Sequence, residues 1–132
     1  MTKKKTILII EQECNLVDGL RRMLEKEGYN VVSIFNHYHL KEMFSDKQPD
    51  LAIININTPK EFGLNILHKT KQTFPFLPII AMTVYTNTLN RKEVNRLGAS
   101  DFIGKPFDVE YLKKRIEELI DNKKSNNHRG KC

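Results

Sequence analysis

The sequence predicts an α/β fold in which a five-stranded parallel sheet lies between two layers of helices. Five short runs are rich in apolar, β-branched residues, and five other segments carry apolar residues at helical spacing. The two kinds of segment alternate along the 132 residues, and the strand-like runs are almost continuously apolar. Right-handed crossovers between parallel strands place helices on both faces, so we expect a doubly wound, three-layer α/β/α domain.

The first half of the chain is expected to supply three strands and two helices. The strands are predicted at residues 6–10 (TILII), 30–34 (NVVSI) and 50–55 (DLAIIN). Between the first two, Leu16, Leu20 and Leu24 recur at helical spacing, and Gly28 follows as a natural residue just past a helix end. Residues 36–45 suit a second, shorter helix.

The second half is expected to supply three helices and two strands. The helices are predicted at residues 64–74, 90–97 and 109–122, and the strands at 77–83 and 101–104. Pro75 closes the first of these helices and Gly98 the second. Asp108 can cap the last helix, in which Leu112 and Ile116 belong to a clear apolar stripe.

The charge distribution indicates one folded domain, residues 1–122, followed by a basic flexible tail, residues 123–132. The formal net charge of +6 comes from the ends, because residues 3–5 are lysines and the tail holds four basic residues. The other 15 basic residues nearly balance the 16 acidic ones. Without interleaved aromatic residues, these ends favour a solvated surface over a nucleic-acid site, although weak binding of nucleic acid through the basic ends stays open.

No part of the sequence resembles a membrane segment. No apolar run approaches the roughly 20 residues that a membrane-spanning helix needs. The N-terminal MTKKK leads into a short apolar run that lacks the small-residue cleavage site of a signal peptide. We therefore expect a cytoplasmic protein that does not contact the membrane.

Polar residues follow four of the predicted strands. In open parallel sheets a site lies beyond the carboxyl ends of the strands, where the strand order reverses. The residues expected to meet there are Glu11, Gln12 and Glu13, Asn55 to Thr58, Thr83, and Lys105 with Pro106. Asn55 is unusual among them, because an amide stands where reaction chemistry would favour a carboxylate.

Four motifs resemble those of the receiver domain of two-component response regulators. These are ILIIEQE at residues 7–13, PDLAIININTPKEFG at 49–63, LPIIAMTVY at 77–85 and LGASDFIGKPF at 97–107. They occur in the family's order and at its spacing, and the resemblance covers residues 5–122. It implies the CheY-like fold, with strand order 2-1-3-4-5 and five helices.

The resemblance also implies a role for each residue near the strand ends. In the family, a kinase phosphohistidine donates a phosphoryl group to an Asp after the third strand, beside a Mg²⁺ ion. By position, the phosphoacceptor corresponds to Asn55, the acidic pair to Glu11 and Gln12, and the Mg²⁺-binding carbonyl to Asn57. The switch hydroxyl corresponds to Thr83 and the switch aromatic to Phe102. The phosphate-binding lysine, with the cis peptide bond that follows it, corresponds to Lys105 and Pro106. Each of these assignments has a plainer alternative. Asn55 could be an ordinary turn residue, the Thr83 hydroxyl could simply satisfy local backbone, and Lys105-Pro106 could serve the turn alone.

The departures from the family pattern change the expected chemistry. A neutral amide is a very weak nucleophile, so Asn55 should not accept a phosphoryl group. Mg²⁺ prefers carboxylate oxygens, and Glu11 is offset by Lys105, so we expect the metal to bind weakly or not at all. With Gln12 also an amide, Glu11 or the Asn55 oxygen is predicted to accept from Lys105. We expect no cofactor and no enzyme activity.

These expectations define a receiver-like signalling domain that acts by protein–protein contact without phosphorylation. In the family, the fourth helix, fifth strand and fifth helix form the face that reports phosphorylation. In this sequence that face would include residues 87–97, Phe102 and Tyr111. The partner would be a histidine kinase, an output protein or a second copy of the chain.

Two other functions remain open at this point. One is a conventional response regulator phosphorylated at an unorthodox residue such as Glu11, Glu13 or Thr58. The other is a binder that holds a small molecule in the altered pocket or nucleic acid on the basic ends.

Overall fold

The structure is a computed structural model that covers most of the chain. It describes the backbone of residues 4–12, 14–56, 60–84 and 91–130, and the side chains of these residues except at 14–16, 60 and 123–130. Among the predicted site and surface positions, Glu13, Asn57, Thr58 and residues 87–90 lie outside the described residues.

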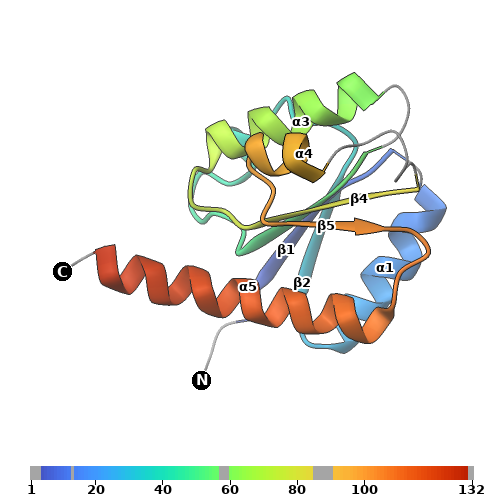
Figure 1. Cartoon of the computed structure of the whole chain (residues 1–132). Coiled ribbons are helices and arrows are strands. Elements are labelled where there is room, and N and C mark those ends of the chain that lie inside the picture. Colours follow the sequence, from blue (N-terminus) through green and yellow to red (C-terminus); the bar gives the residue numbers. More distant parts are fainter. Residues whose placement is uncertain (1–3, 13, 57–59, 85–90, 131–132) are drawn as a thin grey trace.

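Five parallel strands form one sheet in the order β2-β1-β3-β4-β5, as predicted (Figure 1). The strands are β1 (Thr6–Ile10), β2 (Asn30–Ile34), β3 (Leu51–Asn55), β4 (Ile79–Thr83) and β5 (Asp101–Gly104). The order reverses between β1 and β3, which are neighbours with Ile9 opposite Ile53. The carboxyl ends of β1 and β3 therefore lie side by side at the switch point, where open α/β sheets place their sites.

Helices cover both faces of the sheet. They are α1 (Cys14–Lys26), α2 (Leu40–Met43), α3 (Lys60–Thr73), α4 (Arg91–Arg96) and α5 (Val109–Gly130). In Figure 1, α3 and α4 lie over one face, and α1 and α5 lie over the other. Within the part of the chain that the structure describes, no helix is long and apolar enough to span a membrane.

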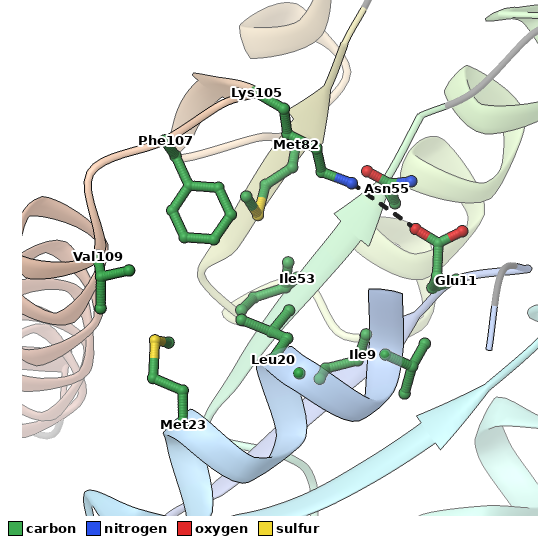
Figure 2. A pocket seen from close by; sticks show the side chains of 12 residues that line it. Ile9, Glu11, Leu20, Met23, Ile53, Asn55, Met82, Lys105, Phe107 and Val109 are labelled. Atoms are coloured by element: carbon green, nitrogen blue, oxygen red, sulfur yellow. Dashed lines mark ion pairs between the residues drawn. The ribbon is translucent and has the colours of Figure 1, made fainter. Parts of the chain in front are cut away.

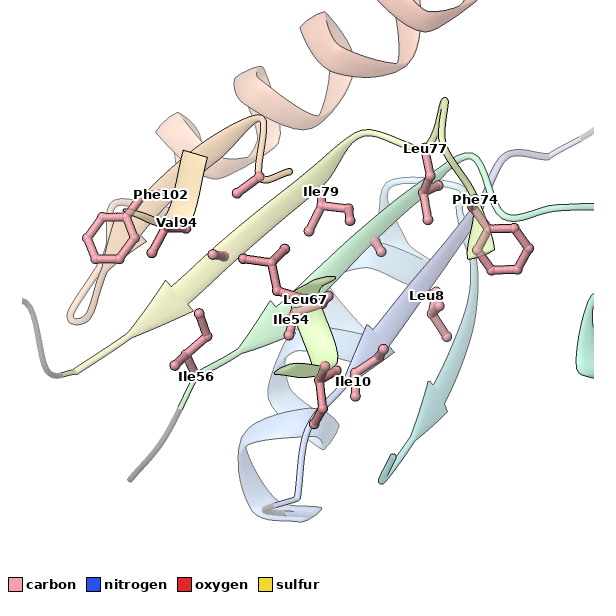
Figure 3. Packing of buried hydrophobic residues seen from close by; sticks show 14 of the residues in the cluster. Leu8, Ile10, Ile54, Ile56, Leu67, Phe74, Leu77, Ile79, Val94 and Phe102 are labelled. Carbon is pink, nitrogen blue, oxygen red and sulfur yellow. The ribbon is translucent and has the colours of Figure 1, made fainter. Parts of the chain in front are cut away.

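The hydrophobic core consists of two clusters, one on each side of the sheet. Alternate strand residues such as Leu8, Ile54 and Ile79 face α3 and α4, where they meet Leu67 and Val94 (Figure 3). Burying one such side chain contributes about 1.5–3 kcal/mol. On the other side, the intervening strand residues face α1 and α5; they include Ile9, Ile53 and Met82.

The predicted ends of the helices are confirmed where a specific residue marks them. Asp108 caps α5, because its Oδ1 accepts hydrogen bonds from the backbone N–H of Glu110 (2.8 Å) and Tyr111 (3.3 Å). Gly28 and Gly98 follow α1 and α4 with φ of 94° and 120°. This left-handed region favours glycine, since it has no Cβ.

Two helices differ most in length from the prediction, and α3 begins at Lys60 rather than at residue 64. Residues 36–45 form only the single turn of α2, whose N-cap His39 makes no capping side-chain hydrogen bond and whose one buried residue is Leu40. In contrast, α5 continues to Gly130, so the segment from residue 123 expected to be a flexible tail is helical this far. Extending an existing helix adds one backbone hydrogen bond per residue without a new nucleation cost, and no proline interrupts the segment.

Candidate functional site

Three residues from distant parts of the chain meet at one end of a cavity. Glu11 follows β1, Asn55 is the last residue of β3, and Lys105 follows β5. All three line the cavity, and Figure 2 shows their polar groups turned toward one another. The sheet topology creates this arrangement, because the carboxyl ends of parallel strands meet at the same edge.

An ion pair joins two of these residues. Lys105 Nζ lies 4.0 Å from Glu11 Oε2, and the two side chains are only 14% and 3% exposed. This distance is at the long end of the range for an ion pair, but the low exposure reduces screening by water. The predicted pairing of Lys105 with Glu11 is present, and their formal charges cancel.

The two amides predicted to mark the altered site occupy different environments. Asn55 is partly buried, and its Oδ1 atom is inaccessible to solvent. Gln12 is exposed and is not among the described residues that line the cavity. The structure therefore brings Asn55, but not Gln12, together with Glu11 and Lys105.

The described donor atoms at this end are few. Glu11 is the one carboxylate among the described residues that line the cavity. Elsewhere in the described part of the chain, no three His, Cys, Asp or Glu residues gather where they could share a metal ion. Among the described side chains at this end, a hard cation would find one carboxylate, already beside a lysine, and the amide oxygen of Asn55.

Thr83 connects the ends of the central strands. Its side chain is fully buried, and its hydroxyl donates a 2.7 Å hydrogen bond to the carbonyl of Ile56. The Ile56 N–H donates to Met82 O at 2.7 Å, and the Lys105 N–H donates to Thr83 O at 2.8 Å. The hydroxyl thus satisfies backbone of the chain just after β3, which is the plainer of the two roles open to it.

Phe102, the predicted switch aromatic, lies inward beneath α4. It is 8% exposed and belongs to the hydrophobic cluster between the sheet and α3 and α4. The Arg91 guanidinium lies 5.4 Å from the ring centroid and also donates a 3.1 Å hydrogen bond to Phe102 O. This position is typical of a cation–π contact, which helps to hold the ring in the interior.

Asp101 connects β5 to both neighbouring helices. Its carboxylate accepts hydrogen bonds from Arg115 Nε (2.7 Å) and Tyr111 OH (3.3 Å) on α5, and from Arg91 Nη1 (3.4 Å) on α4. Burial acts to raise the pKa of Asp101, but the hydrogen bonds from Arg115, the Phe102 N–H and Tyr111 outweigh it and hold the pKa below its usual value. This cluster was not predicted from the sequence, where its one signal is an acidic residue at the start of an apolar, strand-like run.

The connection from β5 to α5 forms one rim of the cavity. The Lys105-Pro106 bond is cis, as the family resemblance implied, and Pro106 itself is exposed. The next residue, Phe107, lines the cavity together with Val109. Neither was predicted from the sequence, since the cavity depends on how this connection approaches α1.

The cavity has a volume of about 350 Å³ and lies between α1, the sheet and the β5–α5 connection. One end, formed by Glu11, Asn55 and Lys105, is called the closed end because the side chains of Glu11 and Lys105 are only 3% and 14% exposed. The other walls are mainly aliphatic and aromatic side chains. They include Val17, Leu20 and Met23 of α1, Ile9, Ile53 and Met82 of the sheet, and Phe107 and Val109 (Figure 2). The site is thus a hollow with an ion pair at one end and apolar walls along the rest.

Comparison of the sequence with known families and proteins gives a consistent match. The family model described as the response regulator receiver domain matches residues 7–117. The transcriptional regulatory protein CrdR of Helicobacter pylori is 28% identical over 120 residues, which are 90% of this chain and 56% of that protein. The transcriptional regulatory protein DltR of Streptococcus agalactiae is 30% identical over 110 residues, 83% of this chain and 49% of that protein. The chain therefore spans about half the length of these curated relatives.

Solved structures agree with the sequence comparison. A CheY-like response regulator receiver domain protein from Methanospirillum hungatei superposes with a TM-score of 0.82 at 26% identity, over 94% of this chain and 99% of that one. NtrX from Brucella abortus, solved in complex with ADP, gives a TM-score of 0.84 at 25% identity, over 97% of this chain and 30% of that one.

Proposed function

Since the chain belongs to the response regulator receiver domain family, we propose that it acts in two-component signalling without phosphorylation at the family's usual position. The single observation that carries this proposal is the position of Asn55. It ends β3 at the closed end of the cavity, beside Glu11 and Lys105, where the family's acceptor aspartate would stand.

The chemistry of an amide supports the proposal. A carboxylate attacks phosphorus as a charged nucleophile, whereas the amide of Asn55 is neutral and a very weak nucleophile. Thr83, at the position of the switch hydroxyl, already donates to the carbonyl of Ile56. Phosphorylation at this position would lack a nucleophile. An added phosphoryl group would also compete with the Ile56 carbonyl for the Thr83 hydroxyl.

The donor set also suits Mg²⁺ poorly. Mg²⁺ demands near-octahedral oxygen coordination and is usually held through carboxylates. Glu11 supplies one carboxylate, and its charge is offset by Lys105 at 4.0 Å. Gln12, at the second position of the family's acidic pair, is a neutral amide with an exposed side chain. We therefore infer that the domain uses no metal or other cofactor, and that it works by contact rather than by catalysis.

Intact mass spectrometry after incubation with acetyl phosphate and Mg²⁺ tests the proposal. The wild-type chain should show no added phosphoryl group. The double variant Asn55→Asp with Gln12→Asp should gain one, because it restores the nucleophile and a second acidic residue on the same scaffold. A phosphoryl group on the wild-type chain would contradict the proposal, and the single variant Asn55→Ala serves as the matched control that cannot be rescued.

The same assay separates the proposal from phosphorylation at an unorthodox residue. If an unorthodox residue were phosphorylated, peptide mapping would find the added phosphoryl group on Glu11, Glu13 or Thr58. Of these, Glu11 is nearly buried and paired with Lys105, which makes it a poor nucleophile for an in-line attack. The other two lie outside the described residues.

The contact surface that we propose is the α4–β5–α5 face, which consists of residues 91–97, Phe102 and Tyr111 in the described part of the chain. Phe102 is buried there, and the exposed side chains include those of Arg91 and Tyr111, which are 60% and 47% exposed. Tyrosine and arginine are enriched at the energetically important centres of protein interfaces. The partner on this face would be a histidine kinase, an output protein or a second copy of the chain.

A photo-crosslinking amino acid placed at residue 111 tests this surface. It should capture a discrete protein partner in the native cell. The matched control is the same amino acid at Phe76, which is more exposed at 75% but lies on the loop between α3 and β4. Equal capture at both positions, or capture at residue 76 alone, would contradict the proposed surface.

A further inference from the structure

We propose that the cavity beside α1 binds a neutral, largely apolar small molecule that carries one hydroxyl or amide group. The cavity has a closed end formed by Glu11, Asn55 and Lys105 and apolar walls from α1, the sheet and the β5–α5 connection. If the domain is not phosphorylated, as proposed above, such a ligand would supply the input signal instead. The role of the ligand as an input signal rests on the proposed function, whereas the binding site itself does not.

The size and lining of the cavity are those of a ligand site. Pockets for small molecules have volumes of about 300–1,000 Å³ and predominantly apolar walls with a few polar groups at defined places. This cavity has about 350 Å³. Protein interiors are otherwise close-packed, and an engineered apolar cavity of about 150 Å³ already binds benzene. A hollow of this size between α1, the sheet and the β5–α5 connection is therefore large enough to hold a small molecule.

An interior glycine of α1 lies on the exposed side of the cavity. Gly19 lines the cavity, and a Cβ atom built on it meets no atom within 4 Å. Glycine in a helix interior costs roughly 0.8–1.0 kcal/mol relative to alanine. Space for a side chain is present at this position, and yet the residue with the poorest helix propensity after proline occupies it. Gly19 and Val109 both line the cavity and are both exposed, so the cavity can be reached from solvent on this side.

The ion pair at the closed end selects the polar group of the ligand. A second carboxylate that approached Lys105 would lie beside Glu11, and an ammonium that approached Glu11 would lie beside Lys105, because the two are 4.0 Å apart. Like charges at this separation disfavour the charged form of the ligand. A hydroxyl group can donate to the carboxylate and accept from the ammonium at the same time, and an amide can do the same. The neutral head group is therefore the one that matches this pair.

Fluorescence titration with N-phenyl-1-naphthylamine tests binding. This probe is neutral, apolar and able to donate one hydrogen bond, and its emission rises in an apolar site. We expect saturable binding of one probe per chain and displacement by decanol. Decanoate at neutral pH should displace it at least about tenfold more weakly, since each 1.4 kcal/mol of unfavourable interaction is tenfold in affinity. Absence of saturable probe binding would overturn the site, and decanoate equal to decanol would overturn the head-group assignment.

Two variants localise the probe. Leu20→Trp places a larger side chain in the hollow and should abolish saturable binding. Lys26→Trp adds the same side chain to the exposed surface of the same helix, outside the cavity lining, and should leave binding unchanged. Thermal unfolding shows that each variant is folded. Equal binding by both variants would overturn the assignment to this cavity.

The variant Glu11→Gln tests whether the ion pair at the closed end selects a neutral head group. It removes the carboxylate and leaves Lys105 as the charged group of the site, so it should shift the preference from decanol toward decanoate by about tenfold or more. An unchanged preference would overturn the role of the ion pair. The phosphorylation assay is independent of these titrations: probe binding with an added phosphoryl group on the wild-type chain would refute the input role but leave the binding site in place.

Discussion

Replacing Asp101 with alanine should destabilise the domain more than any change at its exposed acidic residues. Asp101 is 7% exposed and connects β5 to α4 and α5 through its carboxylate. Alanine removes the acceptor and leaves the Arg115 guanidinium, only 23% exposed, without this partner. The loss is therefore a missing charge-assisted hydrogen bond together with a donor group that water reaches poorly.

The contacts of Asp101 set the magnitude. The bonds from Arg115 Nε and from the Phe102 N–H are both 2.7 Å, so these two should carry most of the effect. Arg91 is 3.4 Å away with its side chain 60% exposed, and its share is small because water replaces the interaction. Hydrogen bonds to charged groups contribute about 1.5–3 kcal/mol each and are not additive, so we expect a loss of roughly 2–4 kcal/mol.

Urea unfolding followed by circular dichroism measures this loss. The midpoint should fall with an unchanged slope, and the melting temperature should fall by roughly 3–5 °C per kcal/mol for a chain of this length. The control is Asp46→Ala, at an exposed position after α2, which should stay within about 0.5 kcal/mol of the wild type. A loss at Asp101 no larger than that of the control would refute the reasoning.

Three further predictions concern pH and the helix ends. The pKa of Asp101 is lower in the folded protein than in the unfolded chain. The contribution of its carboxylate to the free energy of unfolding is therefore fully present above the unfolded pKa and is lost as pH falls through the folded pKa. The stability difference between wild type and Asp101→Asn should shrink below about pH 4, measured by urea unfolding across a pH series. Gly98→Ala should cost about 1–3 kcal/mol in thermal unfolding, because φ is 120° and the new Cβ would lie 2.5 Å from Lys71 Cγ. Asp108→Ala should cost about 1 kcal/mol through loss of the α5 cap, measured in the same way.

Each of these predictions has a matched control or a result that would contradict it. A stability difference at Asp101 that grows toward low pH would contradict the sign of the pKa shift. Gly28→Ala has a similar φ of 94° but no atom within 4 Å of the new Cβ, so it should cost less than Gly98→Ala. Asp108→Asn retains a capping oxygen and should stay close to wild type, and an equal loss in both Asp108 variants would contradict the capping role.

Local patterns in the sequence were sufficient for most of the fold. Apolar, β-branched runs predicted all five strands within two residues of their observed starts. The signal is clearest in β1, β3 and β4, because a parallel strand buried on both faces has no polar side. Asp108, Gly28 and Gly98 predicted helix ends, since capping and positive φ depend on residues close in sequence. The resemblance to receiver domains supplied the strand order and the cis bond before Pro106.

The lengths of α2 and α5 were predicted less well, for opposite reasons. The region around α2 has helical spacing but buries only Leu40, so little tertiary contact extends it beyond one turn. The polar end of α5 lacks the apolar stripe that predicted the rest, and yet it continues a helix that is already formed. Periodicity alone reports which face is apolar, and it does not report where a helix with little burial ends.

The sequence by itself determined which residues stand at the strand ends, including the amide residue Asn55 after the apolar run of the third strand. Only the tertiary structure decided that Glu11 and Lys105 form an ion pair there, that Gln12 is exposed, and that a cavity opens beside them. The reason is physical. Residue identity and strand order bring side chains to one edge, but distances, burial and empty space depend on how α1 and the β5–α5 connection pack on the sheet.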